Sequence, residues 1–246
     1  MTLFKPALLA LTLAALSLTA APAASGSAGM LPAERAPTAR TSVMPASYDW
    51  TGAYAGLQLG HIDGHQGWTF PSIDLLNSGD PRGYIAGAFA GYNWQAGPRL
   101  VFGVEASANA ARASYLRDMF RTNRDRIPGI RSRGLSEVGR TASLRFRVGV
   151  PFDRTLAYAA LGLANTDLRL TWLEDGVVRD RVSQNRTGGL MALGVEQAIG
   201  ERWRLRAEVN YADFGTRRLP AQPGGTPASN SRLIQIGAQL GLAYRF

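Results

Sequence analysis

The chain has 246 residues, a formal net charge of +9 and an isoelectric point near 10.6, and it contains no cysteine. This length fits one large β domain or two small ones, and the lack of cysteine excludes a fold held by disulfides. The basic charge raises nucleic acid as a partner, but the arginines are scattered and no binding motif is present. We therefore expect no nucleic-acid partner.

The first 23 residues have the organisation of a secretory signal peptide. Lys5 precedes an apolar run from Ala7 to about Leu18, and Ala21-Pro22-Ala23 has the form of a cleavage site. An uncleaved anchor helix is the alternative, and the short apolar run favours cleavage. Residues 24–47 are rich in Ala, Pro and Ser without apolar periodicity, which indicates a flexible periplasmic lead-in.

From Tyr48 to Phe246 the sequence alternates between strand and loop patterns. In the strand segments apolar side chains occupy every second position, which is the period of a β-strand. The segments cover residues 50–61, 83–94, 99–108, 142–152, 155–172, 189–200, 202–214 and 233–246. The last is the clearest, because apolar residues alternate without a break from Ile234 to Phe246. The register of 155–172 stays open, because the first part of that segment is apolar on both faces.

The connections between these segments alternate in length. Short ones fall near 95–98, 151–154 and 200–201, and long ones near 62–82, 109–138, 167–186 and 214–231. An even number of strands with this alternation is typical of an outer-membrane barrel. We predict an all-β fold for residues 48–246: an eight-stranded antiparallel transmembrane β-barrel of the OmpA/OmpX kind, with long extracellular loops and short periplasmic turns.

The less apolar face of the strands carries charges of both signs among small residues. These are Glu105, Arg145, Arg147, Glu196, Arg204, Arg206 and Glu208. Alternation alone does not say which face points inward, but size does, since eight strands leave an interior just wide enough for side chains. Unpaired buried charges are costly, so we predict a paired charge network inside the barrel. A narrow, anion-preferring conducting path is the alternative.

Aromatic residues near the strand ends suggest girdles at the two membrane surfaces. The expected periplasmic girdle comprises Trp50, Trp94, Trp203 and Phe246, and the outer one Tyr84, Trp172, Tyr211 and Phe214.

Four segments carry a resemblance to a known family. They are YDWTGAYAGLQLG at 48–60, AGYNWQAGPRLVFGVEA at 90–106, RAEVNYADFG at 206–215 and IGAQLGLAYRF at 236–246. Over residues 48–246 the chain resembles the Omp25/Omp31-like small outer-membrane proteins of alphaproteobacteria. The resemblance implies a barrel integral to the Gram-negative outer membrane that supports envelope integrity and surface interactions, and some relatives are described as porins.

The C-terminal strand is similar to the signature by which the outer-membrane barrel assembly machinery recognises its clients. Leu242, Tyr244 and Phe246 would carry that signal. The arginine-rich second loop departs from the family pattern. Its arginines are Arg112, Arg117, Arg121, Arg124, Arg126, Arg131 and Arg133. We expect them to contact lipopolysaccharide phosphates, and a merely solvated charged loop is the alternative.

A lipid A-modifying enzyme is a third function to weigh, since it needs a nucleophile beside a base. The only histidines are His61 and His65, and the sequence lacks a G-x-S-x-G elbow. Two histidines four residues apart do not converge on one metal when they lie on a strand or loop. We therefore predict no catalytic residue, cofactor or metal, and expect a monomer embedded in outer-membrane lipid.

Overall fold

The structure, a computed structural model, describes residues 48–72, 75–118, 132–221 and 228–246. The signal peptide and lead-in expected for residues 1–47 lie outside these ranges. Within them, all regular secondary structure is β-strand. No helix in this part of the chain has the length and hydropathy of a transmembrane span.

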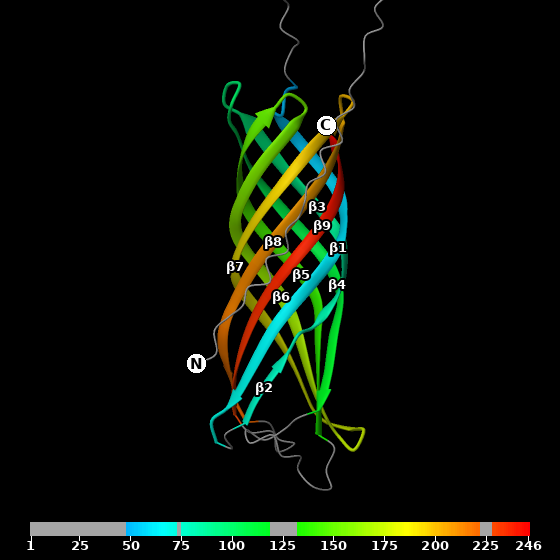
Figure 1. The fold of residues 1–246 in the computed structure, drawn as a ribbon, viewed down its shortest axis with the longest axis vertical. Coiled ribbons are helices and arrows are strands. Elements are labelled where there is room, and N and C mark those ends of the chain that lie inside the picture. The colour runs from blue at the N-terminus through cyan, green and yellow to red at the C-terminus, as the bar shows by residue number, and fades with distance from the viewer. Residues whose placement is uncertain (1–47, 73–74, 119–131, 222–227) are drawn as a thin grey trace, which may run out of the picture. The chain divides into compact units, whose positions relative to one another are not determined.

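The strands form one antiparallel sheet that closes on itself (Figure 1). They are β1 (Gly52–Phe70), β2 (Leu75–Gly79), β3 (Arg82–Gln95), β4 (Val101–Asp118), β5 (Ser132–Phe152), β6 (Thr155–Glu174), β7 (Val177–Ile199), β8 (Trp203–Leu219) and β9 (Ser229–Arg245). Neighbours in sequence pair from β3 to β9, and β1 pairs with both β3 and β9. The predicted barrel fold is therefore confirmed.

The short strand β2 does not add a ninth position to the ring. It pairs with β1 from Gln66 to Phe70, beyond Asp63, where the pairing of β1 with β3 ends. β2 and β3 thus occupy one strand position, interrupted at Asp80 and Pro81. Proline has no N–H to give to a ladder, and Pro81 contributes its carbonyl instead, which accepts a 2.7 Å hydrogen bond from Gly64 N.

All four predicted long loops contain strand, since β4 and β5 also cover 109–118 and 132–138. β1 and β2 fill most of 62–82, β6 and β7 run through 167–186, and β8 and β9 extend into 214–231. β6 and β7 meet at Asp175 and Gly176, with φ of 50° and 84°. Both values belong to the tight type I′ hairpin turn that Asp-Gly favours. The strands of 14 to 23 residues that form the ring far exceed the roughly 9–11 needed to cross a membrane.

These extensions escaped the sequence pattern because their apolar face is reversed. On β6, Leu168 and Leu170 are buried inside, whereas Arg169 points outward to solvent. Nearer the short-turn end of the same strand the outward residues are apolar, and Leu161 and Leu163 are 66% and 62% exposed. One strand therefore passes from apolar to aqueous surroundings, and its apolar side chains shift from the outer face to the inner face.

The outer surface near the short-turn end is an apolar belt. Leu57, Leu144, Leu193 and Leu240 all point outward and are exposed, as a lipid-facing surface requires. The girdle residues Tyr84, Trp94, Trp203 and Phe246 are also exposed, and Tyr211 points outward. Three predicted girdle positions were wrong. They are Trp50 and Phe214, which are buried in the interior, and Trp172, which packs against the interior cluster.

At the long-loop end the ring separates at two seams. Pairing of β7 with β8 stops at Gly189 and Asp213, although β7 continues along β6 to Val177. Pairing of β3 with β4 stops at Ser114, and the end of β4 pairs only with β5. The extensions therefore form two sheets, one of β4 to β7 and one of β8, β9, β1 and β2.

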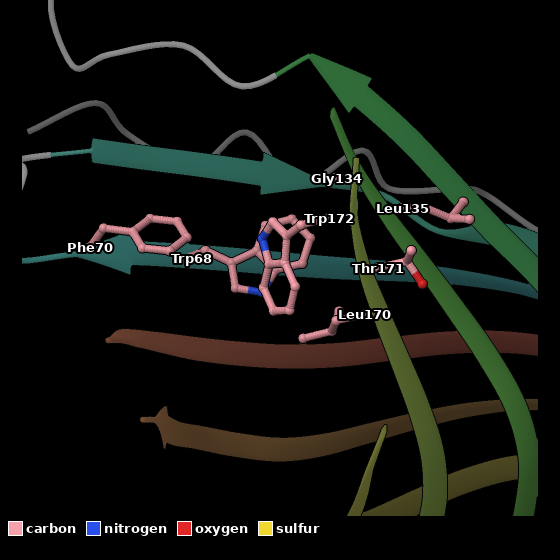
Figure 2. Close-up of a pocket in the computed structure, with 7 residues that line it drawn as sticks. All are labelled: Trp68, Phe70, Gly134, Leu135, Leu170, Thr171 and Trp172. Atoms are coloured by element: carbon pink, nitrogen blue, oxygen red, sulfur yellow. The ribbon is translucent and has the colours of Figure 1, made fainter. Parts of the chain in front are cut away.

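An apolar cluster fills the space between these two sheets. Figure 2 shows Trp68 and Phe70 of β1 facing Leu170 and Trp172 of β6. Leu233 of β9 belongs to the same cluster and is fully buried. The extensions thus pack as a β-sandwich, with polar residues outside and an apolar core within. We call these two packed sheets at the long-loop end the extracellular extension.

Candidate functional site: the lumen and the outer wall

An aromatic plug closes the short-turn end of the lumen. Trp50, just before β1, has no exposed surface and packs with Tyr48, Val101 and Leu156. The Tyr48 and Trp50 rings meet edge to face with centroids 5.0 Å apart. The Arg204 guanidinium lies 4.7 Å from the Trp50 ring centroid, which is cation–π range.

The centre of the lumen is a charge network around Glu105. Its Oε1 accepts from Arg145 at 2.5 Å, and its Oε2 accepts from Arg206 at 2.7 Å and from Arg147 at 3.1 Å. The Tyr54 hydroxyl donates to the same Oε2 at 2.7 Å. One carboxylate is therefore shared by three arginines, and all of these side chains are buried.

Two further carboxylates complete the network. Arg147 donates to Glu196 at 2.7 Å, and Arg145 donates to Glu208 at 2.7 Å. The Tyr158 hydroxyl donates to Glu208 at 2.6 Å. The seven charges singled out in the sequence thus lie together in the lumen. The list is Glu105, Glu196 and Glu208 with Arg145, Arg147, Arg204 and Arg206.

Sheet register brings these charges together. Glu105 is the direct cross-strand partner of Arg145, and Glu196 is that of Arg206. Opposite charges at facing positions of neighbouring strands attract. The network holds four arginines and three glutamates, which leaves one positive charge in excess. Aromatic rings next to the guanidinium groups stabilise part of this positive charge through cation–π contacts. The Arg206 guanidinium lies 3.6 Å from the Phe89 ring centroid.

Sequence reasoning missed the neutral members of this site. Tyr54 and Tyr158 point inward and hydrogen-bond the carboxylates, and Gln58 accepts from Arg206 at 2.8 Å. Phe89 broke the alternation of its segment, and its position in the lumen explains why. An aromatic residue on the otherwise small or polar face was the available signal.

Beyond the network lie a small cavity and then the apolar cluster of the extracellular extension. The cavity measures about 40 Å³ and lies among inward-facing Gln58, Asn109, Leu190 and Gln235. It has room for a water or two. Plug, charge network and apolar cluster therefore follow one another along the lumen.

A buried polar chain ties the two sheets of the extension together. Ser136 of β5 donates to Gln66 of β1 at 2.5 Å, and Gln66 donates to the Ser231 hydroxyl of β9 at 3.2 Å. Arg186 of β7 donates to the Ser231 carbonyl at 3.1 Å. The Ser136–Gln66 and Arg186–Ser231 bonds cross from one sheet to the other, and the Gln66–Ser231 bond joins β1 to β9 within one sheet. The two crossing bonds fix how the sheets align.

The arginines of the predicted second loop are only partly placed. Arg112 and Arg133 are exposed side chains on β4 and β5, and Arg117 falls on β4. The prediction of a single loop from 109 to 138 was therefore wrong, because the strands extend to 118 and restart at 132. The remaining arginines lie outside the described residues. They are Arg121, Arg124, Arg126 and Arg131.

The two histidines point outward from β1. His65 Nδ1 lies 2.7 Å from an Asp80 carboxylate oxygen, and His61 stacks edge to face on Tyr84. Across the described ranges, no group of three or more His, Cys, Asp or Glu converges as metal ligands would.

A model of the outer membrane protein beta-barrel domain matches residues 10–246. The chain belongs to this family. It is 27% identical over 213 residues to the 25 kDa outer-membrane immunogenic protein of Brucella abortus, covering 87% of each chain. It is 28% identical over 230 residues to the 31 kDa outer-membrane immunogenic protein of Brucella melitensis, covering 85% of this chain and 89% of that one. The resemblance to the Omp25/Omp31-like group is thus confirmed.

Among solved structures, OprG of Pseudomonas aeruginosa aligns with 80% of this chain and 96% of its own, at 13% identity and a TM-score of 0.46. Family membership places the protein in the outer membrane. The barrel rule then assigns the short turns to the periplasm and the sandwich to the outside. The apolar belt between them is the lipid-facing surface, and Phe246 lies at its periplasmic edge.

Proposed function

We propose that this member of the family is a sealed barrel that stabilises the outer membrane and presents its extracellular extension for surface interactions. The proposal is carried by the filled lumen. An aromatic plug, a paired charge network and an apolar core lie in series, and each is made of buried side chains. A conducting protein would need a continuous polar path, and the apolar cluster interrupts it.

The test is electrical. Mature protein is refolded, its folding is verified by a heat-sensitive shift in gel mobility, and currents are recorded in a planar bilayer. We expect no discrete steps from folded protein. Reproducible steps would overturn the sealed lumen and favour the alternative, a narrow channel lined by the arginines and glutamates.

The structural role has its own cellular test. A strain lacking the gene should become more sensitive to detergent, and the wild-type gene should restore resistance. Unchanged sensitivity would remove the envelope role.

We propose further that the protein is not an enzyme. Ion-paired side chains occupy the lumen, and among the residues that the structure describes no open pocket there adjoins a nucleophile with a base. Lipid A from strains with and without the gene should give identical mass spectra. A mass difference that depends on the gene would show lipid modification.

We also propose that the C-terminal strand is read by the barrel assembly machinery. Phe246 is 77% exposed, so its side chain contributes little to folding. Phe246→Ala should lower the amount of barrel assembled in cells yet leave refolding in detergent unchanged. Phe152→Ala, at a periplasmic turn and 62% exposed, is the matched control that should assemble normally. Equal assembly of both variants would contradict the assignment.

A further inference from the structure

A groove of about 580 Å³ crosses the outer wall over β4, β5, β6 and β7. The side chains of Arg112, Arg140 and Arg169 that line it are exposed. Inward-facing neighbours Val138 and Leu168 are only 2% and 1% exposed. The groove therefore lies on the outside of the barrel, separate from the lumen.

Two irregularities in the sheet underlie this groove. The register shifts between Ala110 and Ala113 on β4, and again between Val138 and Thr141 on β5. A bulge bends its strand and redirects side chains. Both bulges lie where the membrane barrel gives way to the extracellular extension, so the wall changes direction at the groove.

The groove arginines differ from other outward arginines at this level. Arg82 lies 2.8 Å from Asp63, and Arg232 lies 3.0 Å from Asp213. These two guanidinium groups are therefore neutralised within the protein.

In the groove, by contrast, the cations keep free donors. Arg140 reaches Asp167 only at 3.9 Å, and its side chain is 88% exposed. Arg112 and Arg169 form no ion pair within the described ranges, although Glu137 faces Arg169 across the strands. Glu137 and Asp167 also line the groove, so the three arginines leave it with a net positive charge. Their guanidinium groups offer paired N–H donors of the kind that bind phosphate.

The surface on the membrane side of the groove is apolar and flat. Arg140 faces Ala110 across the strands, and Leu144 and Leu163 continue the belt toward the periplasm. Small outward residues extend this surface across β3, β4 and β5. They are Ala86, Ala88, Ala90, Ala106, Ala108, Ala110 and Ala142. An acyl chain can lie against such a surface without displacing protein side chains.

We propose that this groove binds a phosphate of lipid A, with the acyl chains of that lipid against the alanine surface. The phosphate would be held by Arg112, Arg140 and Arg169 at the headgroup level of the outer leaflet. The inference deepens the envelope role proposed above and rests on it, because it gives the barrel a specific contact with the lipid that forms that leaflet.

The experiment compares two charge-matched triple variants of the mature barrel. R112Q/R140Q/R169Q removes the groove cations, and R217Q/R218Q/R232Q removes three exposed arginines of β8 and β9. Each protein is folded in phosphatidylcholine nanodiscs containing a small fraction of bisphosphorylated lipid A. Lipid retained per protein is then counted by native mass spectrometry after gentle detergent extraction. A gel-mobility shift verifies folding of every variant.

Wild type and the control variant should retain lipid A, and the groove variant should retain about tenfold less, as loss of charge-assisted hydrogen bonds predicts. Phosphate-free lipid A should not be retained by any of them. Equal retention by both triple variants, equal retention of the phosphate-free lipid, or a protein dimer in place of a lipid adduct would overturn the site. Each outcome is independent of conductance and of detergent sensitivity, so failure here leaves the sealed-barrel proposal intact.

Discussion

At the scale of single residues, the lumen depends on how each buried charge is satisfied. Glu208 accepts hydrogen bonds from Arg145 and Tyr158 and is 4% exposed. A buried ion pair need not be more stabilising than apolar residues of the same volume in its place. Removing only one partner, however, leaves the other charge buried and unpaired, which is strongly destabilising. Asp213 makes a superficially similar pair with Arg232, but that pair is in contact with solvent, which screens it.

We therefore expect unequal effects from two similar substitutions. Glu208→Ala should lower the free energy of unfolding by about 3–5 kcal/mol, because Arg145 and Tyr158 lose their shared acceptor. Asp213→Ala should lower it by no more than about 1 kcal/mol. Urea unfolding of each variant in lipid vesicles, followed by tryptophan fluorescence, measures both. Equal midpoints would refute a charge network held together by pairing.

At the scale of the element, one strand has its apolar side chains on different faces along its length. On β1, Leu57 and Leu59 point outward into the apolar belt, whereas Trp68 and Phe70 point inward to the core of the extension. The alternation keeps one phase along β1, with even-numbered side chains pointing inward and odd-numbered ones outward. What changes is the solvent outside, from lipid to water, and with it the side that must be apolar.

Neighbouring positions on β1 give a direct test of this reversal. Phe70 is 1% exposed inside the extension, and Thr69 beside it points outward and is exposed. Phe70→Asp should abolish protection against hydrogen exchange in the extension, because an unpaired carboxylate would be buried in an apolar core. The strands within the membrane should stay protected.

Thr69→Asp serves as the matched control and should change stability by no more than about 0.5 kcal/mol. If both variants lost protection equally, or if neither did, these residues would not lie on opposite faces of a packed extension.

At the scale of the whole molecule, three successive groups of side chains block the lumen. The periplasmic plug, the charge network and the apolar core use different chemistry and lie on different segments. Removing one of them leaves two. The eight strand positions make this possible, since a barrel of that size has room only for side chains.

Trp50→Ala tests the redundancy. Losing a fully buried tryptophan should lower the free energy of unfolding by about 3 kcal/mol. The variant should nevertheless stay electrically silent in planar bilayers, because the network and the apolar core still block the lumen. Trp94→Ala, which changes an exposed girdle residue, is the control for loss of a tryptophan as such. Discrete currents from the Trp50 variant alone would show that the plug is the sole barrier.

The sequence by itself determined the barrel, because eight segments with an apolar residue at every second position are joined by connections that are alternately short and long, which is the pattern of an outer-membrane barrel. It also identified which charges face inward, since Glu105, Arg145 and Arg147 sit on the face opposite the lipid-facing leucines and valines. Only the tertiary structure decided that strands continue into all four of the expected loops, because there the outward positions are polar and the apolar signal moves to the other face.

Tertiary structure also decided the positions of Trp50 and Phe214, which both lie at the ends of segments that the sequence predicts as strands. A girdle residue and a plug residue look alike in sequence, and packing alone distinguishes them. The groove on the outer wall depended on the fold as well. Arg112, Arg140 and Arg169 lie far apart in the chain, and strand register with two bulges brings them to one wall of the groove, which Glu137 and Asp167 also line.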